Sequence, residues 1–89
     1  MYYIYVLISE RDNGFYTGYT DNLKRRIAQH NSGKVQSTNR RRPLKLVYYE
    51  SCLNSVDALH REKYLKTTFG KQFLRNRLKH FLFETKANT

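Results

Sequence analysis

Residues 1–19 constrain the fold most, because they combine two short strands with a strong turn. Residues 2–9 are rich in aromatic and β-branched side chains, which favours a strand that is covered on both faces. Asp12-Asn13-Gly14 is a strong turn signal, so residues 15–19 are expected to return as the second strand of a hairpin. Alternation places Tyr3, Tyr5 and Leu7 on one face of the first strand, and Ile4, Val6 and Ile8 on the other. The first strand is therefore expected in the middle of a sheet.

The rest of the chain is expected to add one strand, three helices and one polar loop around this hairpin. Thr20 or Asp21 can cap a helix that runs to about Asn31, with Gly33 stopping it. Residues 34–42 are polar, basic and without a periodic pattern, which predicts a loop. Residues 44–50, rich in Val, Leu and Tyr, predict a third strand.

Two further helices are expected after the third strand. Residues 55–69 contain neither Gly nor Pro and read as a helix that Asn54 caps and Gly70 ends. Residues 71–83 place apolar side chains between basic ones, as in an amphipathic helix. The predicted order β-β-α-β-α-α gives an α+β domain with a three-stranded antiparallel sheet flanked by helices. We expect a single domain at residues 1–83 and a frayed tail at residues 84–89.

The charge of the chain predicts a polyanionic partner. The chain has 17 Lys and Arg but only seven Asp and Glu, which gives a net charge of +10 on 89 residues. Eight Tyr and five Phe are interspersed with the basic residues. This favours nucleic acid over an acidic membrane, because aromatic rings can stack on nucleobases. A basic face that only improves solubility is the plainer alternative. Cys52 is the single cysteine, so the chain cannot form an internal disulfide, and a cytoplasmic location is expected.

Glu62 is the most informative residue for function. In the expected helix, Ala58, Leu65 and Phe69 form an apolar stripe, and Glu62 fills its missing i+4 position. A carboxylate that faces a core is costly to desolvate unless a cation, a donor or a metal meets it. The structural alternative is an internal salt bridge with Arg26 that fastens two helices.

Residues of the expected first helix and second strand are candidates for the same site. In the first helix, Arg26 and His30 lie one turn apart at the edge of the apolar stripe of Leu23 and Ile27, where both can reach over the sheet. On the second strand, Tyr16 and Gly18 share a face, and the missing Cβ of Gly18 permits a close approach.

These residues together resemble the GIY-YIG nucleases. Tyr3-Ile4-Tyr5 is similar to the first signature of that family, with Tyr3 in place of its Gly, and Tyr16-Thr17-Gly18 is similar to the second, with Thr17 in place of its Ile. The other resembling positions are the arginine Arg26, the His or Tyr position His30 and the metal-binding glutamate Glu62. The resemblance spans residues 2–82 and is nearest to small stand-alone bacterial members, with similarity to the N-terminal nuclease domain of excinuclease proteins and to structure-specific endonucleases.

The resemblance implies a metal-dependent DNA endonuclease that hydrolyses phosphodiester bonds and recognises DNA structure more than sequence. Glu62 would hold one divalent cation, Mg²⁺ or Mn²⁺, and Arg26 would bind the scissile phosphate. Tyr5, Tyr16 and His30 would order the attacking water, with a tyrosine taking its proton. No other acid is placed to build a two-metal site, with Glu50 the nearest candidate, and no small-molecule cofactor is expected.

The expected partner is DNA in branched, flapped or nicked form, without a membrane. The cationic positions Lys34, Arg40, Arg41, Arg42 and Lys45 are expected to follow the nucleic-acid backbone. Lys71, Arg75, Arg77 and Lys79 either extend that surface or form the solvated side of the last helix. Because the domain is small, substrate choice has to come from DNA shape, a partner protein or a homodimer.

Two other functions fit the same residues. The first is a non-catalytic nucleic-acid-binding protein that keeps the nuclease fold and uses its basic surface alone. The second is a small RNA-associated protein of ribosomal type. The enzyme is favoured, because a binding module has no need of an inward carboxylate near Tyr and Arg side chains.

Overall fold

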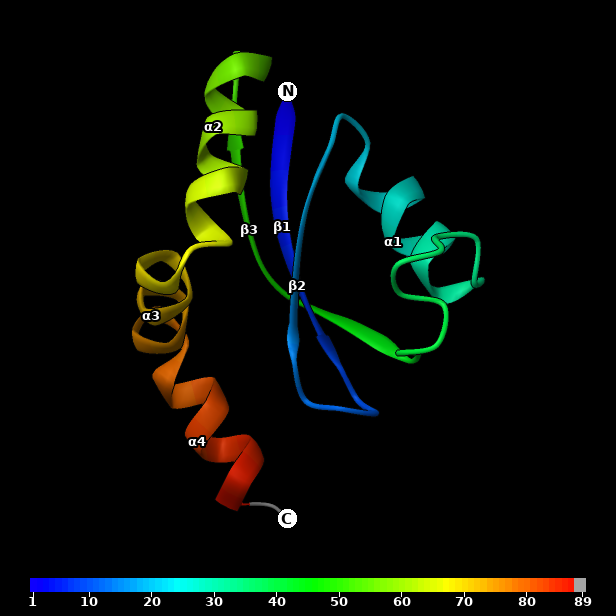
Figure 1. Ribbon diagram of the computed structural model, residues 1–89, viewed down its shortest axis with the longest axis vertical. Coiled ribbons are helices and arrows are strands. Elements are labelled where there is room, and N and C mark those ends of the chain that lie inside the picture. Colours follow the sequence, from blue (N-terminus) through cyan, green and yellow to red (C-terminus); the bar gives the residue numbers. More distant parts are fainter. Residues whose placement is uncertain (88–89) are drawn as a thin grey trace.

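The computed structural model describes residues 1–87, with side chains described through Glu84 (Figure 1). Its elements follow in the order β1 (Tyr2–Ser9), β2 (Phe15–Thr20), α1 (Leu23–Asn31), β3 (Leu44–Cys52), α2 (Ser55–Leu65), α3 (Thr68–Arg77) and α4 (Lys79–Ala87). The predicted α+β class and the three-stranded antiparallel sheet are confirmed. In the described part of the chain, the helices are too short and too polar to cross a membrane.

The three strands form one sheet in the order β2-β1-β3, with β1 in the middle as expected. Both pairings are antiparallel, and Tyr5 of β1 lies opposite Gly18 of β2 and Tyr49 of β3. A register shift interrupts the β1–β3 pairing between Val6 and Leu7. Because β1 has a partner on each side, β2 is an edge strand, and this exposes one side of the second signature to approach from outside the sheet.

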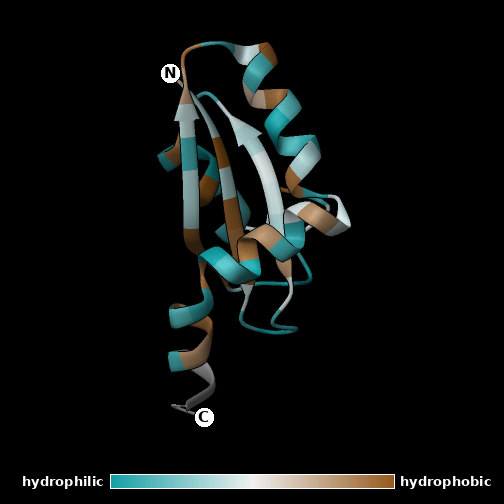
Figure 2. Ribbon diagram, turned by 90° about the vertical axis from the view of Figure 1, so that its left-hand side faces the viewer, coloured by the Kyte–Doolittle hydropathy of each residue, from teal (hydrophilic) through white to brown (hydrophobic). Residues whose placement is uncertain are grey.

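Helices cover the two faces of the sheet unequally. In Figure 1, α1 lies on one side, and α2, α3 and α4 lie on the other. Figure 2 shows α3 running across the strands and α4 descending below them. The core on the α2 and α3 side is apolar and buries Ile4, Val6, Ala58, Leu65 and Leu74. The core on the α1 side buries Tyr5, Leu7 and Leu44. This division follows the predicted alternation of β1, and it places Tyr5 on the α1 side.

The first helix begins one position later than predicted. Asn22, rather than Thr20 or Asp21, is the N-cap of α1, and its side chain accepts a hydrogen bond from the backbone N–H of Arg25. Thr20 instead bonds to the backbone of Asn22, which holds the capping residue in place. Gly33 follows the helix with a φ of 82°, so its predicted role as the stop is confirmed.

The C-terminal helices differ from the prediction in number and bounds. Helix α2 ends at Leu65, and Phe69 is 74% exposed rather than part of the buried stripe. Gly70 lies inside α3, where a Cβ would overlap the carbonyl oxygen of Tyr64. The glycine is therefore required for close contact between two helices, and it does not end one. The single helix expected at residues 71–83 is replaced by α3 and α4.

The chain end continues the last helix. Helix α4 runs to Ala87, so residues 84–87 of the expected tail are helical, and residues 88–89 lie outside the described part. The third strand also extends two residues beyond the predicted end, to Cys52. Asn54 caps α2 as predicted, with its side chain accepting from the backbone N–H groups of Val56 and Asp57.

Candidate active site

A buried hydrogen-bonded chain of three side chains lies at the centre of the candidate site. The hydroxyl of Tyr5 on β1 is 2.8 Å from Nε2 of His30 on α1, and Nδ1 of His30 is 2.7 Å from Oγ1 of Thr38. Tyr5 is 1% exposed, and His30 and Thr38 are fully buried. With both of its nitrogens engaged, the imidazole is held in one orientation.

The electrostatics of this chain keep both rings neutral near neutral pH. Burial, together with the charge of Arg26, lowers the pKa of His30 to about 4. Burial raises the pKa of the Tyr5 phenol, and the hydrogen bond from Arg26 only partly opposes this effect. A neutral imidazole has one donor and one acceptor, so His30 can accept a hydrogen bond from one of its two hydroxyl partners and donate one to the other.

Arg26 connects this chain to the more open part of the site. Its Nε donates to the Tyr5 hydroxyl at 3.4 Å, and its Nη1 donates to Oε1 of Gln29 at 3.1 Å. Because Tyr5 accepts from Arg26, its own proton is available to His30. The guanidinium has five N–H groups, and these two contacts orient it while using two of them. The side chain is half-buried, so its charge is partly removed from water.

Gly18 makes the position of Tyr5 possible. A Cβ on Gly18 would overlap the hydroxyl and ring of Tyr5, which lies opposite it across the β1–β2 pair. The expected close approach at Gly18 is therefore made by a side chain of the neighbouring strand. Any larger residue at this position would move the phenol away from His30.

Tyr16 is the more accessible of the two signature phenols. Its ring centre lies 5.1 Å from that of His30 and 6.4 Å from that of Tyr5, while the residue is only half-buried. Its hydroxyl accepts a hydrogen bond from Ser37 at 3.4 Å. The ring therefore packs against the buried chain while its oxygen lies toward the loop after α1.

Glu62 lies on α2, on the other side of the sheet from α1. Its side chain is 16% exposed and forms a salt bridge of 2.9 Å with Lys66, in place of the alternative ion pair with Arg26. Burial is the main cause of the raised pKa of Tyr5, and the charge of Glu62 adds a smaller contribution, so the carboxylate is electrostatically coupled to the cluster. Tyr5 contacts Tyr16, Arg26 and His30, and Tyr16 also packs against His30. Glu62 is coupled to Tyr5 through its charge.

A metal at this site would have few protein ligands. Among residues 1–87, no group of three or more His, Cys, Asp or Glu side chains is close enough to enclose a metal ion. Glu50, the other candidate acid, is held by Arg61 at 2.9 Å and by the Tyr48 hydroxyl. Glu62 would therefore be the one carboxylate ligand, which suits a hard cation that keeps most of its water ligands.

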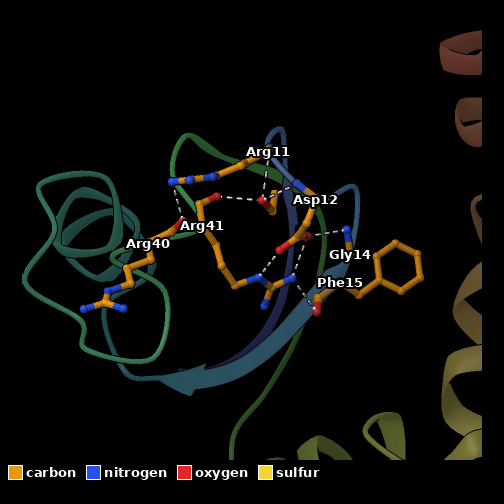
Figure 3. A network of polar contacts seen from close by, with 7 residues as sticks. Arg11, Asp12, Gly14, Phe15, Arg40 and Arg41 are labelled. Atoms are coloured by element: carbon orange, nitrogen blue, oxygen red, sulfur yellow. Dashed lines mark hydrogen bonds and ion pairs between the residues drawn. The ribbon is translucent and has the colours of Figure 1, made fainter.

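The predicted cationic loop is partly used within the molecule (Figure 3). Arg41 donates to both carboxylate oxygens of Asp12, at 2.7 and 3.1 Å, and to the backbone carbonyl of Phe15. The same contact lowers the pKa of Asp12 to about 2. Arg42 donates to the backbone carbonyl of Asn39, while Lys34 and Arg40 have exposed side chains. Arg41 thus pins the loop to the β1–β2 turn.

Comparison with known proteins identifies the family. The family model described as the GIY-YIG catalytic domain matches residues 1–79. The chain belongs to the GIY-YIG family. It is 46% identical over 77 residues to a UPF0213 protein of Pediococcus acidilactici, covering 83% of this chain and 78% of that protein. A UPF0213 protein of Staphylococcus haemolyticus is 43% identical over 75 residues, covering 83% of this chain and 90% of that one.

A solved structure supports the same assignment. The solution NMR structure of a UPF0213 protein from Bacillus halodurans aligns with a TM-score of 0.54 and 34% identity, covering 85% of this chain and 84% of that chain. The match to the GIY-YIG catalytic domain includes all five candidate residues, from Tyr5 to Glu62. The predicted resemblance to small bacterial members of this nuclease family is thereby confirmed.

Sequence reasoning missed three residues that contact the candidate site. Thr38 orients His30, Gln29 orients Arg26, and Ser37 contacts Tyr16. Two of them lie in the loop at residues 34–42, which has no periodic pattern to reveal which side chains turn inward. Gln29 lies three residues after Arg26 on α1, and this helical spacing is a signal that could have been used.

Proposed function

We propose that this chain is a metal-dependent DNA endonuclease that hydrolyses phosphodiester bonds. The observation that supports this most is the contact between Arg26 and the buried Tyr5–His30 pair, beside the accessible ring of Tyr16. Through this contact a guanidinium, a phenol and an imidazole lie together, and the chain matches the family model described as the GIY-YIG catalytic domain. The net charge of +10 suits a DNA substrate.

Arg26 would bind the scissile phosphate. A guanidinium presents planar paired donors that match phosphate oxygens, and Tyr5 and Gln29 already hold this one in place. Because the orientation exists before the substrate arrives, little side-chain entropy is lost on binding. The same charge would stabilise the additional negative charge that develops on the phosphoryl group.

Tyr16 rather than Tyr5 would accept the proton of the attacking water. Tyr5 is 1% exposed and has a raised pKa, so water reaches it poorly and its phenolate is disfavoured. Tyr16 is half-buried with its hydroxyl toward the loop. In this proposal Tyr5 and His30 position Arg26 and the ring of Tyr16, and they do not exchange protons with the substrate.

Glu62 would hold one divalent cation, Mg²⁺ or Mn²⁺. When bound, the cation would neutralise charge on the phosphate oxygens and favour departure of the leaving oxygen. The carboxylate is accessible enough for this, and Lys66 is the partner from which it would have to be released. Lys34 and Arg40, whose side chains are exposed, would contact the DNA backbone without reading sequence, so DNA structure would decide the substrate.

The proposal is tested by incubating the protein with nicked, flapped and branched DNA in the presence of Mg²⁺ or Mn²⁺. We expect cleavage by the unaltered chain and a loss of about a hundredfold or more in Tyr16→Phe and in Glu62→Gln. Glu84→Gln, which removes an exposed carboxylate of α4, is the matched control and should cleave normally. Circular dichroism checks that each variant is folded.

The outcomes separate the enzyme from the binding protein. If the folded, unaltered chain binds these DNAs but cleaves none of them with either metal, the non-catalytic nucleic-acid-binding function replaces the proposal. If Glu62→Gln cleaves like the unaltered protein at every metal concentration, Glu62 does not hold the metal.

A further inference from the structure

A groove with mixed aromatic and cationic walls lies on the opposite side of the sheet from Tyr5, Tyr16 and His30 of the candidate active site. Its floor is one row across the three strands, because Ile8 pairs with Phe15 of β2 and with Lys45 of β3. Residues paired in this way share a face of the sheet. The walls come from Lys71 and Arg75 of α3 together with residues of α4. In Figure 2, α3 crosses the strands and α4 descends from its end.

The side chains of the groove combine positive charge with aromatic surface. Nζ of Lys45 lies 5.3 Å from the ring centre of Phe81, so a cation and an aromatic ring are paired in the wall. Lys71 and Arg75 are exposed and lie one helical turn apart on α3. Within residues 1–87, neither takes part in a salt bridge, and Glu10 is the one acid among the lining side chains. A polyanion that also carries flat rings complements such a groove.

The edge strand β2 links this groove to the candidate active site. Phe15 is directed to the groove, and the next residue, Tyr16, is directed to the opposite face and packs against His30. Arg41 stands at the edge between the two, where it donates to the carbonyl of Phe15 and interacts electrostatically with Tyr16. A ligand that occupies both sites therefore has to turn around the edge of the sheet past a cation.

We propose that the groove binds an unpaired strand that leaves the DNA near the scissile phosphate. Duplex DNA has a persistence length of roughly 150 base pairs, so it is too stiff to bend around one strand of a sheet. An unpaired strand bends freely, exposes its bases to stack on Phe81, and carries phosphates toward Lys71 and Arg75. This inference rests on the proposed function and specifies its substrate as DNA with a single-stranded arm.

The groove is tested by the binding of labelled oligothymidylate and of a nicked duplex without an arm, measured by fluorescence anisotropy with a chelator present. Lys71→Glu reverses one charge in the groove, and Lys63→Glu makes the same change on an exposed residue of α2. We expect Lys71→Glu to weaken oligothymidylate binding about tenfold, and Lys63→Glu to weaken it by no more than about twofold. The nicked duplex should bind the two variants with similar affinity.

A second variant tests the aromatic wall. Phe81→Leu keeps apolar volume but removes the ring, and it should weaken oligothymidylate binding about fivefold or more, because stacking is lost. Urea unfolding checks that the variant is folded. Equal effects of Lys71→Glu and Lys63→Glu would overturn the proposal. So would binding to acidic vesicles that depends on Lys71 while oligothymidylate does not bind.

The assay is independent of cleavage, so the two proposals can fail separately. If Lys71 controls oligothymidylate binding but the unaltered chain cleaves no DNA, the groove stands and the hydrolytic function falls. If flapped DNA is cleaved while Lys71→Glu binds oligothymidylate normally, the enzyme stands and the groove does not hold the arm.

Discussion

The two faces of the central sheet are packed by different chemistry. On the α2 and α3 side, the buried groups are apolar and include Ile4, Val6, Ala58, Leu65 and Leu74. On the α1 side, the buried groups include Tyr5, His30 and Thr38, joined by hydrogen bonds of 2.8 and 2.7 Å. The first face stabilises the fold through burial alone, which has no directional requirement. The second face depends on geometry, and it carries every residue of the candidate active site except Glu62, which lies on α2.

The comparison shows that a small domain can fix the orientation of functional groups by burying them with hydrogen-bond partners. A buried polar side chain is costly unless each of its polar atoms finds a partner. Among the side chains that the structure describes, no buried nitrogen or oxygen lacks a hydrogen bond. The polar face is therefore satisfied, and its groups are fixed in orientation. The stability that this face contributes should therefore change with pH and with the removal of a single hydroxyl group.

The largest effect is expected on the apolar face. Leu74→Ala removes a fully buried side chain of α3, and the free energy of unfolding should fall by about 2–5 kcal/mol, through lost burial and the cavity that remains. Leu53→Ala, at a residue that is 83% exposed, should change it by less than about 0.5 kcal/mol. Urea unfolding monitored by circular dichroism measures both. A similar small change in the two variants would contradict the assigned core.

The next effect concerns pH and should arise on the polar face alone. The pKa of His30 is lowered from 6.5 to about 4 in the folded chain, so between these values the unfolded chain binds the extra proton. Stability is fully present above about pH 6.5 and falls as the pH drops toward 4, by at most about 3 kcal/mol. Urea unfolding at a series of pH values measures this dependence.

The upper half of that pH window isolates the histidine. Ordinary pKa values of Asp and Glu are 3.8 and 4.5, so carboxylates contribute little above about pH 5.5. Leu74→Ala and His80→Gln should keep the slope in this range, since one lies on the apolar face and the other is exposed. A flat profile there would show that His30 titrates normally in the folded chain.

Gly18→Ala should damage the polar face from its edge strand. The added Cβ would overlap the Tyr5 phenol and force it away from His30, costing about 1–3 kcal/mol of unfolding free energy. Gly14→Ala is the matched control, because its Cβ would meet only the ends of the Arg41 and Asp12 side chains, a partly exposed ion pair that can shift more easily than a buried phenol. Thermal unfolding compares the two. An equal loss in both would mean that the effect comes from the glycine backbone and not from the phenol.

The last comparison separates the two signature phenols, and Tyr16→Phe should have the smallest effect of all. Tyr5→Phe leaves Nε2 of the buried His30 without its partner and should cost about 1–3 kcal/mol of unfolding free energy. Tyr16→Phe removes a half-buried hydroxyl whose contact with Ser37 is 3.4 Å long, and it should cost less than about 0.5 kcal/mol. Chemical denaturation measures the pair. If Tyr16→Phe destabilises the chain more, its hydroxyl is structural.

Local pattern was sufficient to predict most of the fold. The alternation along residues 2–9 predicted the two faces of β1, and Asp12-Asn13-Gly14 predicted the hairpin. Asn54 was a correct cap because its side chain acts within three residues of itself. The errors occurred where a distant contact decided the outcome. Gly70 resembled a helix stop, but it lies inside α3 because the end of α2 passes directly against it.

The candidate site was only partly accessible to the same reasoning. Tyr5, Tyr16, Arg26 and His30 were chosen from spacing and resemblance, and they lie in contact. Thr38 was missed, because nothing in a patternless loop shows that its hydroxyl turns back to an imidazole eight residues earlier. The internal use of Arg41 was also missed, because its partner Asp12 lies on a turn far away in the sequence.

Residue types and their spacing along the chain were enough to predict the family, the sheet and the excess of positive charge. Which groups are shielded from water depends instead on packing between distant segments. Tyr5 and His30 are buried while Tyr16 is accessible. Glu62 lies on α2, across the sheet from α1, and Phe15 lines a groove on the face opposite Tyr16. The reason is that desolvation and hydrogen-bond partners arise between segments distant in sequence, and these set the pKa and the reach of each side chain.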